Sequence, residues 1–446
     1  MSFRGSNFLI ILVVFSSWLF AYLGQDSSLT DDFSNALRSD GLGYYSWTQF
    51  FMGEDNLCFT KLRSEIEIYS PLNSWVIKPI ENSPCYLPVY PIGLGILLIP
   101  FYVVAAWISQ AFFNITFDPY SIPFQVIVSM SGAIFVSLGL IVFIRMIQKT
   151  VIPNFAVPST LIALFVLTGS NLLHYATYDG IFSHASSFMI NAAIVYLYLV
   201  QTRETDSRPM HYLLLGFLPI LGSTIRLTNF TFILFLFLVL FQLIKKRQHR
   251  EIRFLALGFI IGLSLLLYQL YIWKLSTGDF FYFTYYSYEG FSLQPEMIPK
   301  ILFSFNPHGL LPWSPILLLS LLGSFKANRF SKPFFWVSFL IFAINTIIFS
   351  SWSQPFGGGA FGNRLFVDLF PLLFLSIAFA YSIKNRIIKI FVYVYSVGCS
   401  IITLHFTYRY WIGQIDFGGM PIDDYMMEIS ILRQNLVISI MEILMT

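Results

Sequence analysis

Long apolar runs recur from one end of this chain to the other, and they constrain its fold more than any other feature. A run of about 20 apolar residues is long enough to cross a bilayer as a helix. Of the 446 residues, 56% are hydrophobic and only 11% are charged, and no stretch has the composition of a water-soluble domain. We therefore expect an all-α polytopic membrane protein, with residues 1–446 forming a single transmembrane domain.

The first apolar run, Asn7–Gly24, follows Arg4 and is not followed by a small-residue cleavage site, so we interpret it as a retained signal anchor with its N-terminus inside. With this anchor, the pattern predicts about eleven transmembrane helices. The other ten are expected near 123–147, 155–172, 184–201, 210–226, 229–244, 252–273, 310–324, 333–350, 366–382 and 388–406.

Basic residues gather in clusters between these spans, as they do in the cytoplasmic loops of membrane proteins. Together with Arg4, the clusters hold sixteen of the 26 basic residues but only three of the 23 acidic ones. This asymmetry predicts that the remaining loops lie outside. The clusters are Arg145 and Lys149; Arg203 and Arg208; Lys245, Lys246, Arg247, Arg250 and Arg253; Lys326, Arg329 and Lys332; and Lys384, Arg386 and Lys389.

One apolar run, Tyr90–Phe113, is left out of the count of spans. If it crossed the membrane, Arg145, Lys149 and every later basic cluster would move to the wrong side. We therefore expect it to form a re-entrant or surface-lying helix pair, broken at Pro100.

The outer side is then expected to carry a long first loop, residues 25–122, and a second loop, residues 275–309. Loops this long in a compact protein are usually functional. Cys58 and Cys85 both lie in the first loop, where a disulfide would suit an oxidising compartment, although the sequence leaves their pairing open. The tail, residues 407–446, is expected either to lie on the outer surface or to cross the membrane once more.

The span Ser350–Leu369 places polar residues at the edge of an apolar helix: Gln354, Asn363, Arg364 and Asp368, beside the glycines 357–359 and Gly362. Charged side chains at a membrane boundary point to a functional site. The short outer turns add His174, Asp179, His184 and Arg226. The His174, Asp179 and His184 spacing is not a recognised metal-ligand pattern, so no metal is expected there. Without a P-loop or a dinucleotide-binding glycine motif, neither nucleic acid nor a nucleotide is an expected partner.

Six short motifs, spread in order along the chain, resemble those of the bacterial family 39-like glycosyltransferases of the GT-C superfamily. The resemblance covers roughly residues 31–382 and rests on the order and spacing of the motifs, since each one alone is weakly specific. They are DGLGYY (Asp40–Tyr45), YPIGLGILLIPFY (Tyr90–Tyr102), FSHASSF (Phe182–Phe188), IRLTN (Ile225–Asn229), HGLLPWSPILLLSLLG (His308–Gly323) and FGNRLFVDLFPLL (Phe361–Leu373).

This resemblance implies a GT-C fold and an inverting transfer of a sugar from a polyprenyl-phosphate donor to an acceptor hydroxyl at the outer face. Relatives in the superfamily include protein mannosyltransferases and lipid A aminoarabinose transferases. The family's first outer loop carries an essential acid, commonly an Asp-Glu pair followed by Tyr. Asp40 matches the first acid, but Gly41 replaces the second. Asp31 and Asp32 therefore remain alternative catalytic carboxylates.

The chemistry assigns further roles. A carboxylate can accept the acceptor's proton, and a planar guanidinium can bind two phosphate oxygens at once. Arg364 is the first candidate for the donor phosphate, with Arg226 and Lys300 next. Candidate substrate-binding residues are Tyr44, Tyr45, His184, Glu289, His308 and Gln354. Members of this family generally work without a metal, so no cofactor is expected.

Structural explanations compete with these roles. Asp40 before Gly-Leu-Gly also fits a turn or a helix cap. Arg364 and Asp368 have the i, i+4 spacing of a helical salt bridge. Arg226, at an outer helix end, also fits a side chain that reaches toward the interface.

Two other functions stay open: a membrane glycan polymerase, and a flippase or transporter for a lipid-linked glycan. Most ionisable residues fall at helix ends rather than in the middle of the apolar runs, which favours an enzyme over a transporter. We expect a monomer in the bacterial inner membrane with its site facing the periplasm. Its partners would be membrane lipids, the donor, and a glycan, lipid or protein acceptor.

Overall fold

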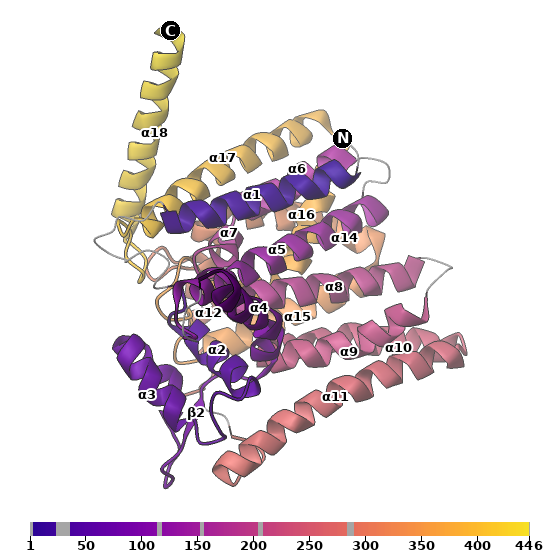
Figure 1. Ribbon diagram of the computed structural model, residues 1–446. Helices are drawn as coiled ribbons and strands as arrows, with labels where there is room; N and C mark the ends of the chain where they lie inside the picture. Colours follow the sequence, from indigo (N-terminus) through magenta and orange to yellow (C-terminus); the bar gives the residue numbers. More distant parts are fainter. Residues whose placement is uncertain are drawn as a thin grey trace.

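The computed structural model describes residues 3–23, 36–113, 118–151, 156–203, 208–282 and 290–445, and these residues form mostly helices (Figure 1). One small antiparallel sheet, β1 (Ile77–Pro79) with β2 (Tyr86–Pro88), lies in the first outer loop. The helices are α1 (Phe3–Leu23), α2 (Asp40–Phe51), α3 (Thr60–Tyr69), η2 (Pro71–Val76), α4 (Gly93–Ile108), η3 (Ser109–Phe113), α5 (Ile122–Thr150), α6 (Ala156–Thr168), α7 (Leu172–Ala176), α8 (Ser183–Arg203), α9 (Pro209–Ile225), η4 (Leu227–Phe232), α10 (Ile233–Lys245), α11 (His249–Thr277), α12 (Met297–Phe303), α13 (Leu310–Trp313), η5 (Pro315–Leu318), α14 (Leu319–Phe330), α15 (Lys332–Ser351), η6 (Arg364–Leu369), α16 (Phe370–Tyr381), α17 (Arg386–Trp411) and α18 (Ile422–Met445).

Within the described residues, 8 helical segments are long and apolar enough to span a membrane. Gly93–Phe112 apart, all of them coincide with expected spans, and shorter apolar helices at Asn7–Tyr22, Ser159–Thr168 and Pro209–Ile225 match three more. The chain is thus a multi-pass, all-α membrane protein, as its apolar runs predict.

The expected span 310–324 is not one helix. Instead α13, η5 and α14 follow one another, and Pro315 opens the middle segment. The interruption has a local cause, because proline lacks the N–H that a continuous helix needs. α14 packs closely on α16, and its Gly323 lies against the backbone of α16 at Ser376.

The expectation for Tyr90–Phe113 is wrong in one respect: α4 runs through Pro100 without a break and continues into the π-helical turn η3. A proline is tolerated inside such a helix when the carbonyl it leaves unpaired finds another partner. Figure 1 shows α4 nearly along its axis, whereas α1, α5, α8 and α11 run across the picture. By length and composition this segment, Gly93–Phe112, is itself long and apolar enough to cross a membrane, so its exclusion from the count of spans rests on the basic clusters alone.

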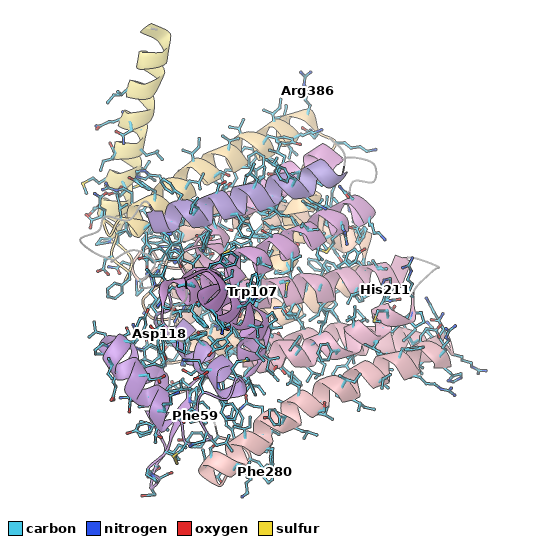
Figure 2. The ribbon with its side chains drawn as sticks, viewed as in Figure 1. Phe59, Trp107, Asp118, His211, Phe280 and Arg386 are labelled. Atoms are coloured by element: carbon cyan, nitrogen blue, oxygen red, sulfur yellow. A yellow bond between two sulfur atoms is a disulfide. The ribbon has the colours of Figure 1, made fainter. Side chains whose placement is uncertain are left out.

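The expected inner and outer segments separate in space. Figure 2 shows Arg386 and His211, which begin helices at expected inner loops, at one end of the bundle. Phe59 and Asp118 of the first outer loop and Phe280 of the second lie toward the other end. The two expected outer loops therefore meet on the same side of the molecule.

The first outer loop is held together by a disulfide between Cys58 and Cys85, which closes the question that the sequence leaves open. The bridge joins the segment before α3 to the sheet, and Tyr86 N donates to Cys58 O in the same place. Against this base, α2 packs on α4: Thr48 Oγ1 donates to Gly95 O, and Trp47 Nε1 donates to Tyr90 O. These two hydrogen bonds fix the position of α2 relative to α4, and with it the position of Asp40, the first residue of α2.

Close packing of α9 on α11 fixes the position of Arg226, the residue that follows α9. A Cβ at Gly258 would lie 1.9 Å from the carbonyl oxygen of Leu213, and one at Gly216 would lie 2.2 Å from that of Leu255. Only glycine permits this approach, which is typical of helix contacts inside membranes.

The tail forms the end of α17 and then α18, a helix that stands away from the bundle and points across the other long helices (Figure 1). Its first turns are anchored by Glu428, which pairs with Arg409 at 2.7 Å and with His405 at 3.0 Å. Tyr425 donates to Pro312 O. α18 is not among the helices of the described residues that are long and apolar enough to span a membrane.

Candidate functional site

A cavity of about 430 Å³ lies where the first outer loop meets the outer ends of α9, α11 and α15. One part of its wall is polar and comes from α2, the turn after α9, and the segment between α15 and α16. Another part is apolar and aromatic. The polar lining residues are Ser39, Asp40, Tyr44, Arg226, Thr228, Gln354 and Arg364; the apolar and aromatic ones include Trp75, Tyr90, Trp273, Phe291, Ile348, Phe349 and Trp352.

Asp40 and Arg364 meet in this wall. Asp40 Oδ2 lies 3.1 Å from Arg364 Nη1, and both residues are largely buried, 7% and 9% exposed respectively. Asp40 is the first residue of α2, after Ser39, whose φ of 46° turns the chain into the helix. The turn places the Asp40 carboxylate next to Arg364. No side-chain hydrogen bond caps the start of α2, so capping does not explain this position.

The glycines before Arg364 make room for it. A Cβ at Gly357 would lie 2.9 Å from Arg364 Cγ, and Gly357 and Gly358 have φ values of 82° and 71° that other residues rarely adopt. On another side the guanidinium lies 5.4 Å from the ring centre of Phe182. The glycine-rich segment predicted to open space beside Arg364 does so.

Arg226 belongs to a second charged group, which Asp368 and His184 complete. Arg226 Nε lies 2.8 Å from Asp368 Oδ2, and Arg226 Nη1 lies 3.3 Å from His184 Nε2. His184 Nδ1 lies 3.2 Å from Asp368 Oδ1. Asp368 therefore pairs with Arg226, and Arg364 pairs with Asp40. The i, i+4 spacing of Arg364 and Asp368 had suggested a salt bridge between those two residues instead.

Of the predicted substrate-binding residues, two line the cavity. Tyr44 stacks on Tyr90 with ring centres 4.4 Å apart, and burial raises the pKa of its hydroxyl, so it stays protonated. Gln354 is exposed at the rim. His184 lies behind the wall, where it contacts Arg226.

Three other predicted residues lie away from the cavity. Tyr45 is on another face of α2 than Tyr44, and its hydroxyl donates to Pro119 O. His308 is buried beside the glycine segment, with Nε2 donating to Phe356 O, and burial lowers its pKa to about 4. Lys300 is exposed on α12. The predicted residues Asp31, Asp32 and Glu289 fall outside the described residues.

His174 and Asp179 separate from His184 and form a different cluster. His174 Nε2 donates to Asp179 Oδ2 at 2.9 Å, and Trp411 Nε1 donates to His174 Nδ1 at 3.0 Å. Arg38 completes the cluster, with Nη2 at 3.3 Å from Asp179 Oδ1. The described residues contain no group of three ligands arranged for a metal ion.

Sequence reasoning missed two features of the site. The first is the part played by Asp368, considered only as a partner for Arg364; an acid in an apolar helix was a signal that a buried partner must exist. The second is the aromatic wall, because Trp75, Trp273 and Trp352 come from distant segments and carry no shared motif.

Chemically, the cavity offers a carboxylate and two guanidinium groups next to a broad apolar surface. Guanidinium groups bind phosphate oxygens in pairs, and the apolar side chains can cover a hydrocarbon chain. Comparisons of the chain with protein-family models, with curated proteins and with solved structures gave no match.

Proposed function

We propose that this protein is a glycosyltransferase of the GT-C type, which moves a sugar from a polyprenyl-phosphate donor to an acceptor hydroxyl at the outer face of a bacterial inner membrane. The observation that carries the proposal is the mixed lining of the cavity. Arg226, Arg364 and Asp40 give it charged groups, and Trp273 and Phe349 of the neighbouring helices give it apolar surface. A ligand that suits such a wall has an anionic head and an apolar tail.

The apolar side of the cavity belongs to helices that face lipid elsewhere along their length. Trp273 is on α11 and Phe349 is on α15, and outward residues of these helices such as Ile260 and Phe339 are 60% and 54% exposed. The polyprenyl chain would then lie against the exposed apolar faces of these two helices, with its phosphate in the cavity.

In the transfer, the acceptor oxygen attacks the anomeric carbon as the bond from that carbon to the phosphate oxygen breaks. Asp40 accepts the acceptor's proton, and the donor leaves as polyprenyl phosphate. A single displacement inverts the anomeric configuration. Arg364 and Arg226 balance the charge that develops on the leaving phosphate, a kind of stabilisation that is strongest where water is excluded.

In the proposed cycle, Asp40 and Arg364 are paired before the donor binds. A phosphate offers Arg364 a doubly coordinating partner. When it takes that partner, Asp40 is released from its contact and becomes available to the acceptor hydroxyl. Donor binding would then prepare the base, and the acceptor would follow.

The test uses purified protein in lipid nanodiscs with a panel of decaprenyl-phosphate sugars, and measures the release of decaprenyl phosphate. With the active donor, Asp40→Asn should lower the rate by about 10² to 10⁴. The matched control, Asp423→Asn, changes an exposed carboxylate of α18 and should leave the rate unchanged. No release with any sugar of the panel would refute monosaccharide transfer. Release of decaprenyl diphosphate from a diphosphate-linked oligosaccharide, tested separately, would instead indicate a polymerase.

A further inference from the structure

Asp368 is an acid with almost no access to solvent, although it lies next to the cavity. It is 1% exposed at the start of the apolar helix that η6 and α16 form, and it is not part of the cavity wall. A buried carboxylate is costly unless charged or polar groups compensate it. Arg226 and His184 do so at 2.8 Å and 3.2 Å.

The hydrogen-bond chemistry fixes the proton on His184. Arginine can only donate, so His184 Nε2, 3.3 Å from Arg226 Nη1, must accept. Nδ1 then carries the proton and donates to Asp368 Oδ1. The neutral imidazole thus connects the carboxylate to the guanidinium, and the three groups close a ring of contacts.

This ring determines how the guanidinium is oriented. Asp368 Oδ2 forms an ion pair with Nε at 2.8 Å that lacks hydrogen-bond geometry, and His184 Nε2 accepts a hydrogen bond from Nη1, so the guanidinium is held at two different nitrogens. Arg226 also approaches Ser183 Oγ through Nη1, at 3.4 Å. Its side chain is 17% exposed and lines the cavity, so the ring presents a fixed cation to whatever binds there.

From these contacts we infer that Asp368 and His184 are positioning residues, which hold the Arg226 guanidinium in the orientation that receives the donor's phosphate. The inference rests on the function proposed above and assigns different roles to the two arginines. Arg364 is paired with a carboxylate that lines the cavity and can exchange it for phosphate. Arg226 is paired with a carboxylate that the ligand does not reach, so its orientation persists whether or not the donor is bound.

Electrostatics alone predicts the opposite effect of removing the acid. A carboxylate close to a bound phosphate repels it, so Asp368→Asn would strengthen phosphate binding if Asp368 were only a counter-charge. If orientation dominates, the same substitution weakens binding, because a misplaced guanidinium loses charge-assisted hydrogen bonds. The sign of the change therefore separates the two roles.

The experiment measures the affinity of the protein in nanodiscs for farnesyl phosphate, with farnesol as the probe that lacks the phosphate. We expect wild type to prefer farnesyl phosphate, and Asp368→Asn to weaken its binding about tenfold while farnesol binding stays the same. In an Arg226→Ala background, Asp368→Asn should cause no further loss. Unchanged or tighter binding by Asp368→Asn would overturn the inference.

His184 provides a second test that does not depend on the acid. His184→Gln keeps one donor and one acceptor on a side chain of similar reach, whereas His184→Leu keeps neither. Gln should retain most of the farnesyl phosphate affinity and Leu should lose it. Equal affinities of the two variants would count against positioning by His184.

Asp179→Asn is the matched control, because Asp179 is also a buried acid that contacts one histidine and one arginine, and those partners are not in the cavity wall. It should leave farnesyl phosphate affinity unchanged. The outcomes also separate the two proposals: if wild type does not prefer farnesyl phosphate over farnesol, both fall. If wild type prefers it and Asp368→Asn binds it equally well, only the positioning role is lost.

Discussion

The protein contains two clusters of the same three residue types, and they differ in what their arginine faces. In one, Asp179 contacts His174 and Arg38; in the other, Asp368 contacts His184 and Arg226. Both histidines are fully buried. Residue type and burial alone do not distinguish the two clusters.

The difference begins with the histidine proton. Trp411 donates to His174 Nδ1, so the proton of His174 is on Nε2, whereas the proton of His184 is on Nδ1. His174 is therefore saturated by protein groups that join the end of α17 to the turn before α8. His184 instead accepts from an arginine that continues to the cavity.

The arginines complete the contrast. Arg38 lies over the ring of Tyr178, 3.7 Å from its centre, and donates to the carbonyl oxygen of the same residue. Arg226 reaches the cavity wall. The first cluster ties elements together, and the second presents a cation, so the same residue types serve stability in one place and ligand binding in the other.

The largest expected effect is the difference in phosphate binding and transfer rate between Arg226→Ala and Arg38→Ala. Arg226→Ala should lower kcat/KM for the donor by about 10² to 10³, because a group that stabilises developing phosphate charge is lost. Arg38→Ala should leave the affinity of the folded protein for farnesyl phosphate unchanged. The release assay and the binding assay measure these effects, and equal losses of phosphate affinity in the two variants would remove the distinction between the clusters.

The next effect concerns stability. Asp179→Asn should lower the free energy of unfolding by about 2 to 3 kcal/mol, because Arg38 keeps its charge in a largely buried place without its carboxylate. Denaturant unfolding of the protein in detergent, followed by near-UV circular dichroism, measures the change. A variant as stable as wild type would show that this cluster does not hold the outer helix ends together.

A smaller loss should follow from Trp411→Phe. The ring is kept, but the Nε1 hydrogen that His174 Nδ1 accepts is removed, which costs about 1 kcal/mol. The control is Trp336→Phe, at a position of α15 that is 58% exposed and should be nearly neutral. Identical unfolding curves for the two variants would contradict the assigned proton position on His174.

The smallest effect is a dependence on pH. Burial lowers the pKa of His174 below its usual 6.5, and the neighbouring Asp179 offsets only part of that change. The unfolded chain therefore binds this proton more readily, so stability is complete above pH 6.5 and is lost as the pH falls below it. Between pH 7 and 6 the loss should stay under about 1 kcal/mol.

Asp179 does not contribute in that range. Burial acts to raise its pKa, but His174 and Arg38 outweigh burial and lower it to about 2, so its contribution is lost only as the pH falls from about 4 to 2. His308, with a pKa lowered to about 4, contributes in the same range, so His174→Gln should reduce the slope of the unfolding profile between pH 7 and 6 without removing it. An unchanged slope in this variant would show that His174 does not contribute.

The sequence predicted the membrane helices well because each depends mainly on its own composition. The run at 252–273, for example, lies within α11, and the one at 388–406 within α17. It failed where local proline rules conflict with packing. Pro100 was expected to break a helix and does not, whereas Pro315 opens a short 3-10 segment where one span was expected.

At the site, the sequence singled out Asp40, Arg226 and Arg364, and the structure brings all three to one cavity. It could not separate Tyr44 from Tyr45. Consecutive residues of a helix point about 100° apart, so one faces the cavity and the other faces Pro119, and only the packing of α2 decides which. The competing structural explanation for Arg364, an i, i+4 pair with Asp368, did not anticipate Asp40 as a partner, because spacing reports neighbours within one helix only.

What the sequence by itself determined is the class of protein, a multi-pass membrane protein made mostly of helices. Apolar length and basic residues act on the bilayer segment by segment, so they can be read without knowing any contact. The tertiary structure alone decided which carboxylate meets which arginine. Asp40 reaches Arg364, and Asp368 reaches Arg226, from distant parts of the chain, because helix packing sets those distances and the energy of a charge pair depends on distance and burial.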